Sequence, residues 1–338
     1  MSLEVLWFII VAVFWTGFFV LEGFDFGVGA LHKAIGRTDL ERRMAINAIG
    51  PLWDGNEVWL IVGGAAIFAA FPSWYATWFS AGYLALFLVL VALIIRGVSF
   101  EWRARVDTDR WRGTWSWTLT VGSVLVPALL GVALGDLLVG LPIDGSDEFT
   151  GSFWDLLTPY GLWLGFTLLV LSLLHGATFL GLKTDGAVRL RAGGLARKLA
   201  WPAAVLVAAY AVWTVSISAA GTWRIVASAI PAVAALAAAL LIRSGHEGRS
   251  FAATAVTIGG TVAALFANLY PNVMISSTNT ANSLTVNGAA SSEYALKVMT
   301  VVALVMTPVV LLYQGWSYWV FRARIRTPPE PAATTIYS

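Results

Sequence analysis

The sequence predicts an all-α integral membrane protein of about nine transmembrane helices, and its composition and apolar runs are the reasons. Hydrophobic residues make up 58% of the 338 residues and charged residues only 12%, far from the balance of a soluble domain. About 20 apolar residues span a bilayer as a helix, because backbone groups in lipid must bond within their own segment. Nine such runs occur, at 5–30, 52–71, 76–96, 115–140, 160–182, 199–219, 223–243, 251–270 and 295–320.

Lysine and arginine predict the orientation of these spans. When alternate loops are assigned to opposite sides, 19 of the 21 basic residues fall on one side, and only Arg224 and Lys297 fall on the other. Basic loops remain in the cytoplasm, so the N-terminus is predicted outside and the C-terminus in the cytoplasm. The net charge of +2 therefore reflects topology and does not indicate nucleic-acid binding.

A weak internal repeat predicts how the spans are grouped. LEGFDFG in the first span aligns with LHGATFLG in the fifth, which pairs Gly23 with Gly176 and brings Phe26 near Phe179. These two spans run in the same direction, as they would in two parallel four-helix bundles. The expected parts are a first bundle at 1–140, a second bundle at 160–270 and a peripheral helix at 295–320, all in one membrane domain at 1–326, followed by a disordered Pro-rich tail at 327–338.

Four acidic residues inside the first two spans give the strongest indication of function. Glu22 and Asp25 fall in FFVLEGFDFGVG, and Asp54 and Glu57 fall in GPLWDGNEVWLIVGG. Each pair has i,i+3 spacing, which puts both carboxylates on one face of a helix. A carboxylate in hydrocarbon is costly, so it faces a bundle interior or a water path and marks where protons or ions move.

The four carboxylates are expected at similar depth in the cytoplasmic half of the membrane, because the first two spans run in opposite directions. Arg96 ends the third span at the same face and is the expected counter-charge, while His175 lies in the cytoplasmic half of the fifth span. Two interpretations remain open from the residues alone. The group is either a satisfied polar knot in which Arg96 neutralises a carboxylate, or a proton intake whose carboxyl groups keep protons at neutral pH and pass them inward.

Metal and haem sites are not predicted in this chain. A carboxylate-rich metal site would need the Glu-x-x-His pairs of di-iron bundles, which the sequence lacks, and the absence of cysteine excludes iron–sulfur clusters. A six-coordinate haem needs two axial ligands at matched depth. His32 and His246 are expected at loop edges, so only His175 lies well inside a span, and Met274 and Met299 are too near the external face to pair with it.

Five stretches spread from the first span to the last carry a resemblance to a known family. They are LEGFDFGVGAL, GPLWDGNEVWLIVGGAAIFAAFPSWYA, RGVSFEWR, LHGATFLGLKT and LYPNVMISSTNTANSLTVNGAASSEYALKVM. In these stretches, and above all in WDGNEVW, the chain resembles subunit II of cytochrome bd quinol oxidase. The resemblance implies nine helices, arranged as two four-helix bundles plus a peripheral helix. It also implies an obligate heterodimer with subunit I, which holds two haems b and one haem d and oxidises quinol.

The resemblance also implies a role for each residue that matches these motifs. The proton path would comprise Asp54, Glu57, Asp25 and Glu22, supported by Arg96, Trp53, Asn56 and His175. Asp54 matches a family carboxylate thought to admit cytoplasmic protons toward the oxygen-reducing haem of the partner subunit. Reduction of oxygen to water consumes four protons. Drawing them from the cytoplasm would build proton-motive force while quinol releases its own protons outside.

The expected function is that of a non-haem subunit of a terminal oxidase in the bacterial cell membrane, which stabilises subunit I and supplies it with protons. The Lys-poor, Ala- and Arg-rich composition favours menaquinol as substrate of the complex. Small single-span accessory subunits, membrane lipid and quinone are the other expected partners. The alternative is a proton-coupled secondary transporter that uses the same carboxylates, with Gly55 opening the helix. A purely structural scaffold differs only in whether Asp54 and Glu57 carry protons.

Overall fold

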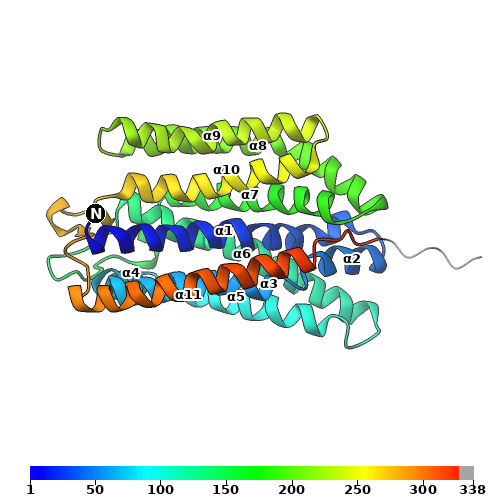
Figure 1. The fold of residues 1–338 in the computed structure, drawn as a ribbon, viewed down its shortest axis with the longest axis horizontal. Helices are drawn as coiled ribbons and strands as arrows, with labels where there is room; N and C mark the ends of the chain where they lie inside the picture. The colour runs from blue at the N-terminus through cyan, green and yellow to red at the C-terminus, as the bar shows by residue number, and fades with distance from the viewer. Residues whose placement is uncertain (327–338) are drawn as a thin grey trace, which may run out of the picture.

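Long helices run side by side along one axis in the computed structural model, which describes residues 1–326 (Figure 1). The predicted tail at 327–338 lies outside the described residues. The α-helices are α1 (Leu3–Ile35), α2 (Asp39–Ile49), α3 (Trp53–Ala70), α4 (Pro72–Ala81), α5 (Tyr83–Trp102), α6 (Asp109–Val139), α7 (Pro159–Lys183), α8 (Gly186–Ile217), α9 (Thr222–Arg243), α10 (Glu247–Leu269) and α11 (Glu293–Val320). The short elements are η1 (Phe153–Leu156), β1 (Asn272–Met274), η2 (Thr280–Asn282) and β2 (Leu284–Thr285), with β1 and β2 antiparallel.

Eight helices in residues 1–326 are long and apolar enough to cross a membrane, whereas the sequence predicted nine apolar spans. The missing one is α3, because its first two turns carry Asp54, Asn56 and Glu57. Its 18 residues still extend about 27 Å at 1.5 Å per residue. The helix therefore has nearly the length of a span but not the apolar content of one.

Three boundaries differ from the prediction. The third span, expected at 76–96, is divided into α4 and α5, which are separated at Gly82. The basic segment after the fifth span was expected to be a loop, but it forms the first turns of α8. The segment after the first span contains α2, whose capping box joins Thr38 and Glu41. Apolar runs could not reveal these parts, because α2 and the start of α8 are polar helices at a membrane surface.

The helices pack by close backbone approach at glycines. Helices α7, α8, α9 and α10 each contact the next, and α10 returns to α7. Helix α1 contacts α3, α6, α7 and α10, which places it in the middle of the molecule (Figure 1). A Cβ atom on Gly27 would lie 2.8 Å from the Gly176 backbone, so α1 and α7 cross where neither has a side chain. Helix α11 lies at the edge, and Leu296 is its one buried residue.

Charged side chains gather at one end of the helices, here called the basic end. Ion pairs at this end join Asp39 to Arg103, Glu41 to Arg191, and Glu247 to Arg324. The opposite end carries η1, β1, η2 and β2 (Figure 1). The molecule therefore has two chemically different ends, separated by an apolar middle.

Candidate functional site

Arg96 of α5 is the centre of a buried ionic cluster. Its guanidinium Nη1 lies 2.6 Å from Glu22 Oε1 of α1 and 3.3 Å from Glu57 Oε2 of α3. The side chains of Arg96 and Glu22 are completely buried, and that of Glu57 is 22% exposed. The guanidinium also faces the rings of Phe26 and Phe100, at 4.7 and 5.3 Å from their centroids. Three helices thus place two carboxylates and a cation in one apolar shell.

Asp25 joins this cluster to α3 and α11 through Asn56. Asn56 Nδ2 donates to Asp25 Oδ2 at 2.7 Å and to the Leu21 carbonyl at 3.2 Å. Its Oδ1 accepts from Gln314 Nε2 at 3.1 Å and from the Tyr318 hydroxyl at 2.8 Å. Both N–H groups and both oxygen lone pairs of the buried Asn56 amide are therefore directed at four fixed groups. The contacts from α11 could not be foreseen, because they join residues more than 250 positions apart.

The WDGNEVW motif divides its side chains between two environments. Trp53 stacks on Phe100 with ring centroids 4.7 Å apart, so it covers the ring that faces Arg96. Asp54 is exposed, and no hydrogen bond or ion pair in the described residues joins it to the cluster. Three of the four predicted carboxylates therefore meet near Arg96. Asp54 lies about one helical turn from Glu57, on the exposed side of α3, which we call its open side.

His175 is a fully bonded residue of the second half of the chain. It is completely buried, and its ring stacks on Phe251 at 4.5 Å. Its Nε2 donates to the Val20 carbonyl at 3.2 Å, since a carbonyl can only accept, and its Nδ1 contacts the Thr254 hydroxyl at 2.7 Å. Both ring nitrogens are occupied, which gives His175 a hydrogen-bonding role between α1, α7 and α10.

His32 was expected at a loop edge, and that expectation is wrong. It lies inside α1 with no exposed surface, because α1 continues to Ile35. Its Nδ1 donates to the Gly29 carbonyl at 2.7 Å, and its Nε2 is buried without a hydrogen-bond partner in residues 1–326. Its position seven residues after Asp25, two turns along the same face of α1, was the signal that could have placed it with the acids.

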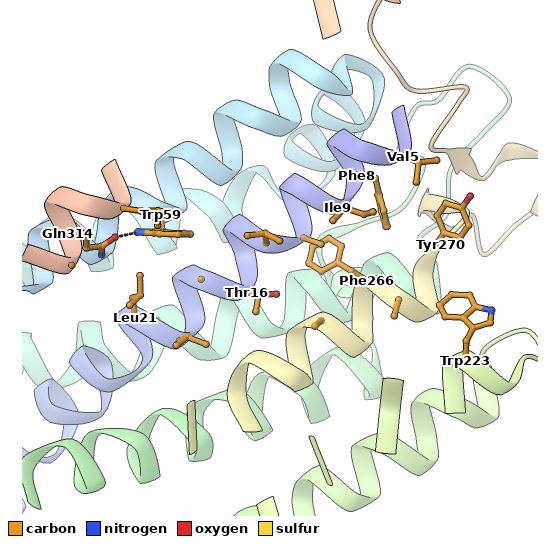
Figure 2. Close-up of a pocket in the computed structure, with 18 of the residues that line it drawn as sticks. Val5, Phe8, Ile9, Thr16, Leu21, Trp59, Trp223, Phe266, Tyr270 and Gln314 are labelled. Carbon is orange, nitrogen blue, oxygen red and sulfur yellow. Dashed lines mark hydrogen bonds between the residues drawn. The ribbon is translucent and has the colours of Figure 1, made fainter. Parts of the chain in front are cut away.

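A large apolar groove runs beside the cluster between α1, α3, α10 and α11 (Figure 2). Its volume is about 1050 Å³, and Trp59 and Gln314 close one side through a 2.9 Å hydrogen bond. No histidine or methionine lines it. The groove therefore offers no histidine or methionine to haem iron, and His175 could ligate iron elsewhere only by breaking one of its two hydrogen bonds.

Comparison with known proteins identifies the family. The model of cytochrome bd terminal oxidase subunit II matches residues 3–321. The chain belongs to this family. It is 42% identical over 328 residues to cytochrome bd ubiquinol oxidase subunit 2 of Bacillus subtilis, covering 96% of this chain and 97% of that protein. Cytochrome bd-I ubiquinol oxidase subunit 2 of Escherichia coli K12 is 36% identical over 360 residues, covering 96% and 95%.

The fold has a counterpart among solved structures. A chain of the bd oxidase from Geobacillus thermodenitrificans superposes with a TM-score of 0.68 at 18% identity, covering 95% of this chain and 97% of that one. The family resemblance expected from the motifs is thus confirmed, together with the multi-pass all-α membrane architecture. The transporter alternative is not favoured, because the family and these relatives are oxidase subunits.

Proposed function

We propose that this chain is the non-haem subunit of a quinol oxidase in the bacterial plasma membrane, where it stabilises subunit I and supplies it with cytoplasmic protons. The relatives in two bacteria are ubiquinol oxidase subunits, which supports the complex and its quinol substrate. The observation that carries the proton role is the buried cluster of Glu22, Asp25, Glu57 and Arg96. The preference for menaquinol stays a prediction.

The basic end supports a cytoplasmic orientation for the outer part of this cluster. Membrane proteins retain Lys- and Arg-rich loops in the cytoplasm. Helix α1 ends at the basic end, so its N-terminus faces the outside in this orientation. The contacts among α7, α8, α9 and α10, and those of α1 with α3 and α6 and of α6 with α5, are consistent with two four-helix bundles and α11 beside them.

The proposed route starts at the open side of α3 and ends inside the molecule. Asp54 is exposed, Glu57 is partly exposed, and Glu22 is completely buried, so exposure falls stepwise along the acids. Arg96 contacts both Glu57 and Glu22, and it can exchange one for the other as its ion-pair partner. The cluster holds three carboxyl groups for one guanidinium, and a carboxyl group in excess of its cation can hold and release a proton in an apolar shell.

The outer faces of α3 and α5 support the proposed contact with subunit I. They expose large apolar side chains, among them Val58, Ile61, Phe68, Leu84, Phe87 and Ile94. Asp54 lies at the start of α3, on the same exposed side, where protons would enter. The haems are assigned to subunit I, since neither the groove nor His175 suits iron. Accessory single-span subunits stay a prediction.

Oxygen consumption with quinol by the purified complex tests the proposal. Asp54→Asn should lower turnover by about tenfold or more with the haem spectrum unchanged, because a positioned proton-transfer group is removed at constant size. Asp107→Asn is the matched control, since Asp107 is an exposed carboxylate beyond α5 and away from the cluster. Unchanged turnover in Asp54→Asn, Glu57→Gln and Asp25→Asn would leave this subunit as a scaffold. Purification of the native chain without a haem-bearing partner would refute the oxidase assignment.

A further inference from the structure

A row of small polar residues lies where α1 packs against α6, on the side of α1 that also carries Asp25. We call it the α1–α6 seam, and it consists of Gly29 and His32 of α1 with Ser116, Thr120 and Ser123 of α6. Ser116, Ser123 and His32 are each no more than 1% exposed. An interface between two membrane helices needs small residues for packing, but it does not need an imidazole.

His32 is the titratable member of the seam. Its Nδ1–H group donates to the Gly29 carbonyl, and Nδ1 lies 2.7 Å from the carbonyl oxygen. Nε2 is therefore the nitrogen that can gain and lose a proton. That atom is buried and has no hydrogen-bond partner in residues 1–326. The charged groups acting on the ring are Arg103, Lys33 and Arg42, and no ion pair ties it to a carboxylate in that part of the chain.

Ser123 continues the seam toward the cluster. Its Oγ is buried without a hydrogen-bond partner in the described residues, and it lies so close to Gly29 that a Cβ atom there would approach it to 2.1 Å. The neighbouring Gly122 lets Arg96 approach α6, since a Cβ atom on Gly122 would lie 2.9 Å from the Arg96 Cβ. The Nε and Nη2 groups of Arg96 are buried and also lack hydrogen-bond partners in the described residues.

The other end of the seam reaches the surface of the basic end. Ser116 Oγ accepts from Arg103 Nε at 2.8 Å, and Arg103 Nη2 lies 2.5 Å from Asp39 Oδ1. The Asp39 side chain is 37% exposed, so this chain of contacts begins in bulk water. Thr120 lies between the two serines, and its hydroxyl donates to the Gly29 carbonyl at 3.5 Å.

These contacts indicate a path for water. A buried polar atom without a partner costs about 1–3 kcal/mol, and native proteins satisfy such atoms with ordered water. Two of them lie in the seam, at His32 Nε2 and Ser123 Oγ, and two more are nitrogens of Arg96 in the neighbouring cluster. His32 and Asp25 are seven residues apart, about 10 Å along the helix, a distance that Ser123 and a few waters can bridge.

We propose that the α1–α6 seam is a second proton inlet, in which His32 and Ser123 order a chain of water molecules leading from the basic end to the Glu22–Arg96 cluster. The inference rests on the proposed function, and it adds an entrance inside this subunit to the one at Asp54. A proton from water on the Asp39 side binds His32 Nε2 and leaves the same atom to water on the Ser123 side. The Nδ1–H bond to Gly29 stays intact, so no ring rotation is needed.

Proton uptake tests the inlet in the purified complex. The reduced complex is mixed with oxygen beside a pH-indicating dye, and His32→Leu and Ser123→Ala are compared with the native protein. Each should slow uptake in part with unchanged haem spectra, because the Asp54 entrance still operates, and each should slow it further when combined with Asp54→Asn. Ser172→Ala is the matched control, because Ser172 of α7 is also a buried serine without a hydrogen-bond partner in the described residues but lies outside the seam. It should leave uptake unchanged.

The outcomes separate this inference from the proposed function. If Asp25→Asn slows uptake while His32→Leu and Ser123→Ala do not, the inlet is refuted and the cluster keeps its role. If Asp25→Asn and Asp54→Asn also leave uptake unchanged, the proposed proton role fails and the inlet fails with it. If the seam variants slow uptake while Asp54→Asn does not, the seam is the main entrance.

Infrared spectroscopy tests for water in the seam without reference to turnover. The chain has no cysteine, so Ser123→Cys introduces one S–H stretch against a clean background from this subunit. In heavy water the S–H group of this variant should exchange to S–D about tenfold faster than that of Ser172→Cys, because exchange of a buried group depends on its access to solvent. Equal exchange rates would refute a water path at Ser123.

Discussion

The two halves of the chain use the middle of the helices in different ways. In α1 and α5 the buried polar groups include Glu22, Asp25 and Arg96, all of them able to carry charge. In α7 and α10 they include His175, Thr178 and Thr254, joined by hydrogen bonds of 2.7 to 3.3 Å. The two sites are neighbours, since α1 crosses α7 between them. They lie at corresponding positions, because Glu22 and His175 each precede the glycine that aligns the two segments.

This difference separates a functional cluster from a structural one. Both ring nitrogens of His175 have hydrogen-bond partners, so neither is free to bind a ligand or a proton. Arg96 keeps two buried nitrogens without hydrogen-bond partners in the described residues. A charged side chain in lipid is costly, and one whose polar atoms are not all satisfied marks a functional site. The comparison therefore predicts that variants in the first half change activity and variants in the second half change only stability.

The largest effect is expected when Arg96 is removed. Arg96→Met leaves Glu22 buried without its cation, which costs about 3–5 kcal/mol, so little folded complex should be recovered. The double variant Glu22→Met with Arg96→Met should restore much of the yield, because no buried anion remains. Yield and thermal unfolding of the detergent-solubilised complex measure both. Arg224→Met is the control, since Arg224 is buried but contacts the carbonyls of Ala219 and Tyr270. Equal losses in both single variants would contradict the argument.

The convergence of this cluster could be predicted from the sequence, but its composition only in part. The span directions predicted that Glu22, Asp25, Glu57 and Arg96 share one depth, and the structure brings them together. Asp54 stays apart because i,i+3 spacing leaves a 60° difference in direction around a helix, enough to put one side chain in the interior and the other outside. His32 was missed because the end of α1 was set by hydropathy, which stops before the polar turn that the helix still includes.

The next largest effect concerns the contact between the two halves. A Cβ atom on Gly27 would lie 1.9 Å from the Ser172 carbonyl oxygen, and this backbone atom cannot move aside. Gly27→Ala should therefore destabilise the protein by about 3 kcal/mol, the upper end for overpacking, measured as a lower midpoint of thermal unfolding. Gly193→Ala in α8 is the control, with nothing within 4 Å of its added methyl group. It should be neutral or slightly stabilising, and a similar loss in both would contradict the crossing.

A smaller effect is expected in the second half. Thr254→Val removes the hydroxyl that contacts His175 Nδ1 at 2.7 Å and leaves a buried acceptor unpaired. The cost is about 1–2 kcal/mol, seen in thermal unfolding, while oxygen turnover and its pH profile should equal those of the native complex. A changed pH profile would show that the His175 site takes part in proton transfer, and the distinction between the two halves would then fail.

The smallest effect lies at the surface of the basic end, where Glu41 of α2 meets Arg191 of α8 at 2.5 Å and ties the halves together. The hydrogen bond from Arg191 lowers the pKa of Glu41 below its ordinary value of 4.5. A carboxylate with a lowered pKa stabilises the fold above the ordinary value, and this contribution is lost as the pH falls through the lowered one. Glu41→Gln should therefore reduce the unfolding temperature slightly at pH 7, as expected for an ion pair near the surface. The difference from the native protein should shrink as the pH falls below 4.5 and vanish once the pH is below the lowered pKa of Glu41. A difference that persisted in acid would mean that the amide disturbs the capping box at Thr38, and that the ion pair itself contributes nothing to holding the halves together.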